Sequence, residues 1–141
     1  ITMVVLKMPL SQEFLSVGVC YENTEKVENF LKDFLEEKNV RPAVRHKLLV
    51  ALDEIYSNLV QYSDAGFLEL SFAMEKEFIY VTFCDDGSPY NPLEQPDPDV
   101  ELPMQERKIG GLGIYLVKKT MDETAYEYNN GKNVFRIGLR R

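Results

Sequence analysis

Two polar residues that could do chemistry together lie in the long apolar pattern "ALDEIYSNLVQYS". Glu54 and Asn58 are four residues apart, so on a helix they are neighbours at the margin of the apolar face, while Asp53 is expected to face solvent. A carboxylate partly withdrawn from water accepts a proton near neutral pH more readily than an exposed one. An amide oxygen is a hard ligand that suits Mg²⁺. Taken alone, the pair is more often a surface glutamate beside a helix-compatible asparagine.

The segment "VTFCDDGSP" ends an apolar run with Asp85, Asp86 and Gly87. A carboxylate fixed at the end of a strand can accept a hydrogen bond from an exocyclic amine such as that of adenine. Glycine at position 87 would let a flat ring approach the backbone, because it has no side chain to obstruct the approach. The alternative interpretation is an ordinary Asp-Gly turn, which is common.

Three glycines in four residues (Gly110, Gly111 and Gly113) precede an apolar helical pattern in "KIGGLGIYLVKKT". Free N–H groups and the dipole at a helix start attract anions, and glycine leaves those groups unobstructed. The dipole is worth only ~0.3–1 kcal/mol for an exposed charge, so a phosphate cradle would need a metal or basic helpers such as Arg107 and Lys108. Neither the Rossmann nor the P-loop spacing is present, and a flexible hinge before a helix is the alternative.

The elements that must position these residues follow from the hydrophobic period. Alternation predicts strands over residues 4–6, 15–20, 68–73, 78–84, 126–128 and 135–139. Helical spacing predicts helices over residues 24–39, 42–62 and 112–120. Elements in this order predict an α+β fold, a two-layer α/β sandwich in which three main helices cover a mixed, mostly antiparallel sheet.

Local signals mark the ends of several elements. Asn23 or Thr24 is expected to cap the first helix, and Asn39 is expected to end it. The dipeptide Asn130-Gly131 predicts a tight hairpin between the last two strands.

The segment 88–109 follows neither period. Five of the seven prolines lie in it, together with several acidic residues. It cannot form one regular helix or strand along its length, and loops this long are usually lids, binding loops or disordered segments. Because it lies between the Asp85 motif and the glycine cluster, we expect a mobile lid rather than a passive insertion.

Composition limits the class of protein. A chain of 141 residues predicts one domain over residues 1–141, and a net charge of −7 argues against direct binding to nucleic acid. No apolar run approaches the ~20 residues needed to span a membrane, and the first residues do not read as a signal peptide. We therefore expect a cytoplasmic protein in which Cys20 and Cys84 are reduced thiols.

The motifs gain weight from their order along the chain: E-x-x-x-N on a helix, D-x-G at a strand end, a long lid, and G-x-G opening a helix. This order resembles the Bergerat fold, the ATP-binding domain of the histidine kinase-like ATPase superfamily, which includes DNA gyrase, the ninety-kilodalton heat-shock chaperones, histidine kinases and mismatch-repair ATPases. The resemblance covers nearly the whole chain. The segment "GGLGIYLVKKTMDETAYEYNNGKNVF" is further similar to the short bacterial anti-sigma factor serine/threonine-protein kinases.

The resemblance implies that the motif residues bind Mg²⁺ and ATP and that one of them is catalytic. By position they are the general base Glu54, the Mg²⁺ ligand Asn58, the adenine-binding Asp85 with Gly87 beside the base, the phosphate-loop residues Gly110, Gly111, Leu112 and Gly113, and the lid residues Arg107 and Lys108, which approach the terminal phosphate. Many of these kinases carry a histidine four residues after the asparagine, where this chain has Tyr62. The single histidine, His46, is expected to be structural.

The implied function is Mg²⁺-ATP-dependent phosphorylation of a small antagonist protein in partner-switching regulation. The implied partners are this anti-sigma factor antagonist, a small STAS-type protein, and also a sigma factor, and the implied assembly is a homodimer. Two alternatives stay open: a non-catalytic module in which ATP switches a protein contact, and a detached histidine kinase-type ATPase domain. Glu54 argues against the first, and we expect no room in 141 residues for the phosphoacceptor hairpin of a complete histidine kinase.

Overall fold

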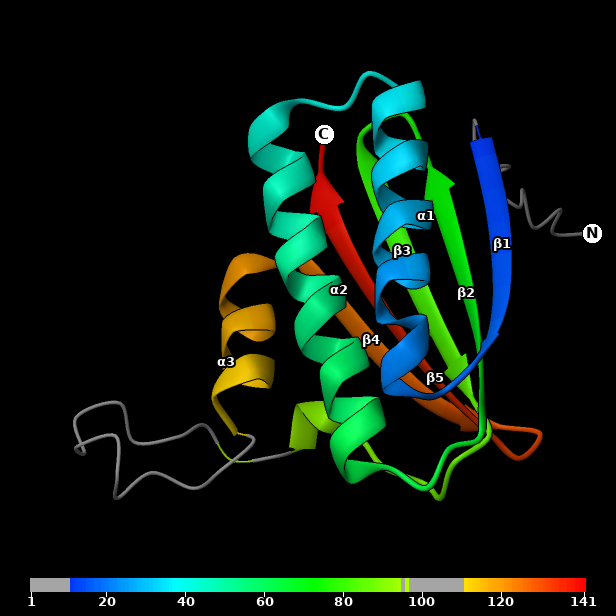
Figure 1. Ribbon diagram of the computed structural model, residues 1–141. Coiled ribbons are helices and arrows are strands. Elements are labelled where there is room, and N and C mark those ends of the chain that lie inside the picture. The colour runs from blue at the N-terminus through cyan, green and yellow to red at the C-terminus, as the bar shows by residue number, and fades with distance from the viewer. Residues whose placement is uncertain (1–10, 95, 97–110) are drawn as a thin grey trace, which may run out of the picture.

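The computed structural model describes residues 11–94, 96 and 111–141, in which three α-helices cover one face of a five-stranded sheet (Figure 1). The elements in chain order are β1 (Ser11–Gly18), η1 (Tyr21–Asn23), α1 (Thr24–Glu37), α2 (Pro42–Tyr62), β2 (Phe67–Met74), β3 (Phe78–Asp85), η2 (Pro92–Glu94), α3 (Gly111–Thr120), β4 (Glu123–Asn129) and β5 (Lys132–Arg140). The short strand predicted at 4–6 lies outside the described residues. The predicted α+β class, with helices in one layer and strands in the other, is confirmed.

The strands are arranged in the order β1-β2-β3-β5-β4, and all four pairings are antiparallel. The predicted hairpin is present: Asn129 pairs with Lys132, and Asn130 and Gly131 between them have φ angles of 53° and 75°. Positive φ at both central residues is the requirement of the tight turn that Asn-Gly favours. In Figure 1 the C-terminal end of α2, the end of β3 and the start of α3 all lie toward the lower end of the molecule.

The core lies between the two layers, because buried side chains alternate with less buried ones along the central strands β2 and β3. On β2, Leu68, Leu70 and Phe72 are buried and face the helices. Helix α1 packs onto this row, and the rings of Phe30 and Phe34 lie 5.4 and 5.6 Å from that of Phe72. These contacts orient the helical layer relative to the sheet.

The bounds of the first strand and the cap of the first helix differ from the predictions. The first strand spans Ser11–Gly18 rather than residues 15–20, since the chain turns into η1 directly after it. The first helix begins at the expected place, but the capping prediction was wrong: the Asn23 amide donates back to the Gly18 carbonyl (2.8 Å) and no side-chain cap forms. Asn39, the residue predicted to end this helix, lies two residues after its last residue and has a φ angle of 54°.

Two further predictions concern the cysteines and membrane-spanning helices. Cys20 and Cys84 are both free thiols, as expected. Within residues 11–94, 96 and 111–141, no helix is long and apolar enough to cross a bilayer.

Candidate functional site

Glu54 lies against the start of α3. A Cβ atom at Gly113, in the first turn of α3, would lie 2.3 Å from the Oε2 atom of Glu54 and 3.2 Å from its Cδ atom. Because glycine has no side chain, the Glu54 carboxylate can lie this close to α3; a side chain at position 113 would have to displace it. The two helices thus bring the predicted general base into contact with a predicted phosphate-loop glycine.

The helix start on one side of this contact favours an anion. The first backbone N–H groups of a helix have no intrahelical partner, and they carry the positive end of the helix dipole. The first turn of α3 holds no acidic residue of its own. Glu54, which comes from α2, is therefore a carboxylate beside an anion-attracting helix end.

Asn58 lies one turn further along α2, about 6 Å from Glu54 along the helix axis. Its side chain is half-buried, as is that of Glu54. Within the described part of the chain it has no hydrogen-bond partner, so both its amide oxygen and its amide nitrogen are available to a ligand. Among all the residues that the structure describes, there is no cluster of three or more His, Cys, Asp or Glu residues that could hold a metal ion.

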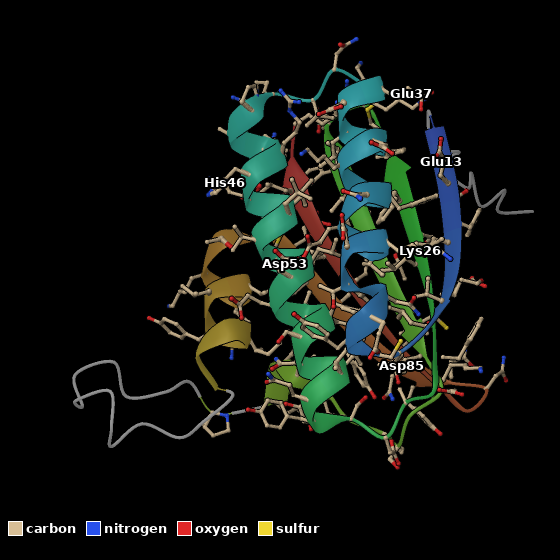
Figure 2. All side chains as sticks on the ribbon, in the orientation of Figure 1. Glu13, Lys26, Glu37, His46, Asp53 and Asp85 are labelled. Atoms are coloured by element: carbon tan, nitrogen blue, oxygen red, sulfur yellow. The ribbon has the colours of Figure 1, made fainter. Side chains whose placement is uncertain are left out.

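Asp53, adjacent in sequence to Glu54, belongs to a different environment on α2 (Figure 2). It is exposed, as predicted, but it approaches Glu28 of α1 closely enough for the two carboxyl groups to share a hydrogen bond. Desolvation, this hydrogen bond and repulsion by Glu28 and Glu54 raise the pKa of Asp53 to about 7. Asp53 is therefore paired with a second carboxyl group between α1 and α2, and its environment differs from that of Glu54.

Asp85 is the last residue of β3 and is only 7% exposed. Its Oδ1 atom accepts hydrogen bonds from the backbone nitrogen of Gly87 (2.9 Å) and from Nδ2 of Asn133 (3.1 Å). Its Oδ2 atom has no hydrogen-bond partner among the described residues. A buried carboxylate is thus held through one oxygen and leaves the other to a ligand, near the lower end of the sheet in Figure 2.

Gly87 is closely packed in the turn after β3. A Cβ atom there would lie 3.0 Å from Asp64 Oδ1 and 3.0 Å from Asp85 Oδ1. Asp64, which follows the end of α2, accepts hydrogen bonds from the backbone nitrogen (2.7 Å) and the hydroxyl of Ser88, and these bonds lower its pKa. The turn is therefore fastened to the segment that leaves the helix of Glu54 and Asn58.

The neighbouring aspartate, Asp86, has a structural role. Its Oδ1 atom accepts hydrogen bonds from the backbone nitrogens of Gly66 (2.9 Å) and Phe67 (3.0 Å), and these bonds lower its pKa. Asp86 thus fixes the start of β2, whereas Asp85 faces the interior.

Sequence reasoning missed Asn133, which is 4% exposed and bonded through both ends of its amide. Besides Asp85, its Nδ2 atom donates to the carbonyls of Gly87 (3.2 Å) and Ser88 (2.9 Å). One signal was present: Asn133 shares a strand face with Phe135, Ile137 and Leu139, so it is a polar residue at an inward position. A buried amide of this kind needs partners, and that requirement could have drawn attention to it.

Other predicted residues are described only in part or not at all. Arg107, Lys108 and Gly110 lie outside the described residues, as does most of the predicted lid. Of Gly111 and Leu112, the structure gives the backbone as the first turn of α3.

Tyr62 and His46 are the remaining residues of note on α2. Tyr62 is the last residue of the helix and is 57% exposed. His46 is exposed near the other end of α2 (Figure 2).

Comparison with known sequences finds one matching family and several relatives. The family described as "Histidine kinase-like ATPase domain" matches residues 20–139. The serine-protein kinase RsbW of Bacillus mycoides is 24% identical over 92 residues, which cover 60% of this chain and 58% of that protein. RsbW of Halalkalibacterium halodurans is 28% identical over 88 residues, covering 58% and 54% respectively. The chain thus spans little more than half the length of these relatives.

Two solved structures share the architecture. The catalytic domain of histidine kinase ThkA has a TM-score of 0.51 and 14% identity, and the match covers 91% of this chain and 97% of that one. Histidine kinase AdeS of Acinetobacter baumannii has a TM-score of 0.50 and 18% identity, covering 93% and 68%. At these identities the likeness concerns the fold alone, and it confirms the fold predicted from the order of motifs.

Proposed function

Because this chain belongs to the family of histidine kinase-like ATPase domains, we propose that it binds ATP and phosphorylates serine or threonine residues of a partner protein. The observation that carries the proposal is the contact of the Glu54 carboxylate with Gly113 at the start of α3. It joins a proton acceptor to a helix end suited to phosphate, which is what transfer to a hydroxyl requires. We also propose that residues 1–141 form one domain with a lid at about 88–109.

The nucleotide binds with its base and its phosphates at different elements. The Asp85 Oδ2 atom accepts a hydrogen bond from the exocyclic amine of adenine, and Gly87 lies beside the ring. The phosphates lie at the start of α3, against the backbone of Gly110–Gly113. Arg107 and Lys108 approach the terminal phosphate from the lid.

Asn58 fits a magnesium site, because its amide oxygen is a hard ligand with no hydrogen-bond partner among the described residues. Mg²⁺ with ATP phosphates needs only one or two ligands from the protein. When bound, the ion supplies positive charge that offsets charge on the phosphates.

Glu54 acts as the general base for the hydroxyl of the acceptor. Its carboxylate takes the hydroxyl proton while the oxygen bonds to the γ-phosphorus, and the bond from that phosphorus to the bridging oxygen breaks, so that ADP leaves. Such transfer depends mainly on positioning and on electrostatic stabilisation by groups already in place. The start of α3 provides the electrostatic stabilisation through its backbone N–H groups.

The relatives are named serine-protein kinases, which supports a protein as the acceptor. We propose that the acceptor is a small STAS-type antagonist, that the chain also binds a sigma factor, and that it acts as a cytoplasmic homodimer without contacting nucleic acid.

The test combines nucleotide binding with phosphate transfer. The purified chain is titrated with a fluorescent ATP analogue and then incubated with Mg²⁺, γ-labelled ATP and the antagonist from the same genome. We expect label on serine or threonine, and we expect Glu54→Gln to lower the rate at least about 100-fold while ATP still binds. Asp53→Asn is the matched control, since it neutralises the adjacent carboxylate and should retain transfer.

Each other result would assign a different function to the chain. Binding of ATP without transfer, together with nucleotide-dependent affinity for a partner, would make it a non-catalytic switch. Label on histidine would favour a detached histidine kinase-type domain. Absence of ATP binding would contradict the proposal altogether.

A further inference from the structure

Asn133 occupies the position on β5 directly opposite Asp85 on β3. Residues opposite each other on antiparallel strands point to the same face of the sheet, so both side chains enter the interior together. Asn133 has no part in the proposed chemistry, yet it is one of two buried polar residues among those described, and Asp85 is the other.

The nitrogen end of the Asn133 amide restrains the Asp85 carboxylate. Nδ2 lies 3.1 Å from Asp85 Oδ1, which also accepts the backbone N–H of Gly87 at 2.9 Å. Two donors from different directions on one oxygen oppose rotation of the carboxylate about its Cβ–Cγ bond. The direction of Oδ2 is thereby set.

The oxygen end of the same amide is held in turn. Asn133 Oδ1 accepts hydrogen bonds from the backbone nitrogen of Tyr90 (3.0 Å) and from the hydroxyl of Tyr126 on β4. The Asn133 side chain therefore cannot flip without exchanging donors for acceptors at both ends. Its contacts with the carbonyls of Gly87 and Ser88 join the turn beside Asp85 to this network.

We propose that Asn133 is a positioning residue that gives the site its preference for adenine over purines with an oxygen at carbon 6. The inference rests on the proposed binding of ATP. A carboxylate oxygen fixed in direction accepts a hydrogen bond from the adenine amine, but it repels the carbonyl oxygen that hypoxanthine places there. A carboxylate free to rotate can turn away from that carbonyl or meet the neighbouring ring N–H, so it discriminates less.

The test compares ATP with inosine triphosphate as competitors of a fluorescent ATP analogue. The wild-type chain should prefer ATP, and Asn133→Ala should lower the ratio of the two affinities by about tenfold or more, the range for losing a hydrogen bond to a charged group. Asn129→Ala on the same hairpin, where the side chain is exposed, is the matched control and should keep the wild-type ratio. Circular dichroism establishes that each variant is folded, and Asn133→Ser, which keeps a small polar group, replaces Asn133→Ala if that variant does not fold.

The outcomes separate this inference from the proposed function. A lower ratio, through weaker ATP binding, tighter binding of inosine triphosphate or both, supports it. An unchanged ratio overturns it, and so does an equal loss of affinity for both nucleotides, which would mean a purely structural role; both results leave ATP binding by the wild-type chain intact. If the wild-type chain binds neither nucleotide, the proposed function fails and the inference fails with it.

Discussion

The Oε2 atom of Glu54 lies 2.3 Å from the place where a side chain at Gly113 would begin. Two helices that are distant in sequence are thus matched to one another at a single glycine, at the point where a carboxylate meets a helix start.

Gly113→Ala should separate stability from activity. Alanine favours a helix by about 1 kcal/mol over glycine, but its Cβ would displace the Glu54 carboxylate at a rotamer cost of about 0.5–1.5 kcal/mol. The free energy of unfolding should therefore change by less than about 1 kcal/mol, whereas phosphate transfer should fall about 100-fold because the base is misplaced. Urea unfolding and single-turnover transfer measure the two effects.

The Gly113 prediction has an internal control. In a Glu54→Gln background the base is already lost, so adding Gly113→Ala should lower transfer little further. Two losses that simply multiply would mean that Gly113 acts independently of Glu54.

Gly87→Ala should destabilise the turn that holds Asp85. The new Cβ would lie 3.0 Å from Asp64 Oδ1 and 3.2 Å from the backbone nitrogen of Ala65, and the backbone cannot move aside cheaply. We expect a loss of about 1–3 kcal/mol in the free energy of unfolding. Gly66→Ala is the matched control, because the nearest atom would lie 4.0 Å away. Equal effects of the two substitutions in urea unfolding would contradict the packing argument.

Asp53→Asn should stabilise the protein at alkaline pH. The pKa of Asp53 is raised from 3.8 to about 7, so between these values the folded protein holds a proton that the unfolded chain has released. The free energy of unfolding of the wild type therefore falls as pH rises from 3.8 to about 7, and the penalty is constant above that. Since Asp53 is exposed and water screens its charge, we expect the variant to gain only about 1 kcal/mol at pH 8.

The pH dependence of this gain is the decisive measurement. The gain in the free energy of unfolding from Asp53→Asn, measured by urea unfolding, should be smaller at pH 5 than at pH 8. Asp33→Asn, which alters an exposed acid on α1 without a hydrogen-bond partner in the described ranges, should show no such difference. A gain that does not vary with pH would contradict proton sharing with Glu28.

Tyr56→Phe should loosen the attachment of α2 to the segment that follows β1. The buried Tyr56 hydroxyl donates to the Cys20 carbonyl (2.7 Å) and lies 3.3 Å from the Cys20 nitrogen, which donates to it. Removing it leaves these backbone groups without that partner, at a cost of about 1–2 kcal/mol in the free energy of unfolding. Tyr62→Phe at the exposed end of the same helix is the control and should change stability by less than about 0.5 kcal/mol.

The repeating elements could be predicted because their signal is local. Alternation in β2 and the Asn130-Gly131 turn each depend on neighbouring residues, and the structure follows both. The capping of α1 could not be predicted in detail, because the Asn23 amide bonds to Gly18 rather than to the helix. A residue that can cap also has competing partners that only the folded chain brings near.

In the candidate site too, features set by local sequence could be predicted and those that depend on the folded chain could not. The sequence identifies Glu54 and Asp85 by residue type and by position in an element. It does not reveal Asn133, since the bond from Asn133 to Asp85 joins residues 48 apart and depends on the register of β3 with β5. Nor does residue type reveal that Asp53 shares a proton with Glu28 across two helices.

The place of β3 in the sheet has a consequence for how the protein opens. This strand has hydrogen-bonded neighbours on both sides, β2 and β5, so its amides exchange with solvent only when the whole sheet opens. The start of α3 instead touches α2 at a side-chain contact and can separate from it in a local opening. In hydrogen–deuterium exchange, Phe83 should therefore be protected far longer than Ile114. If the proposed function holds, a nucleotide enters and leaves on the α3 side while Asp85, at the end of β3, stays in place.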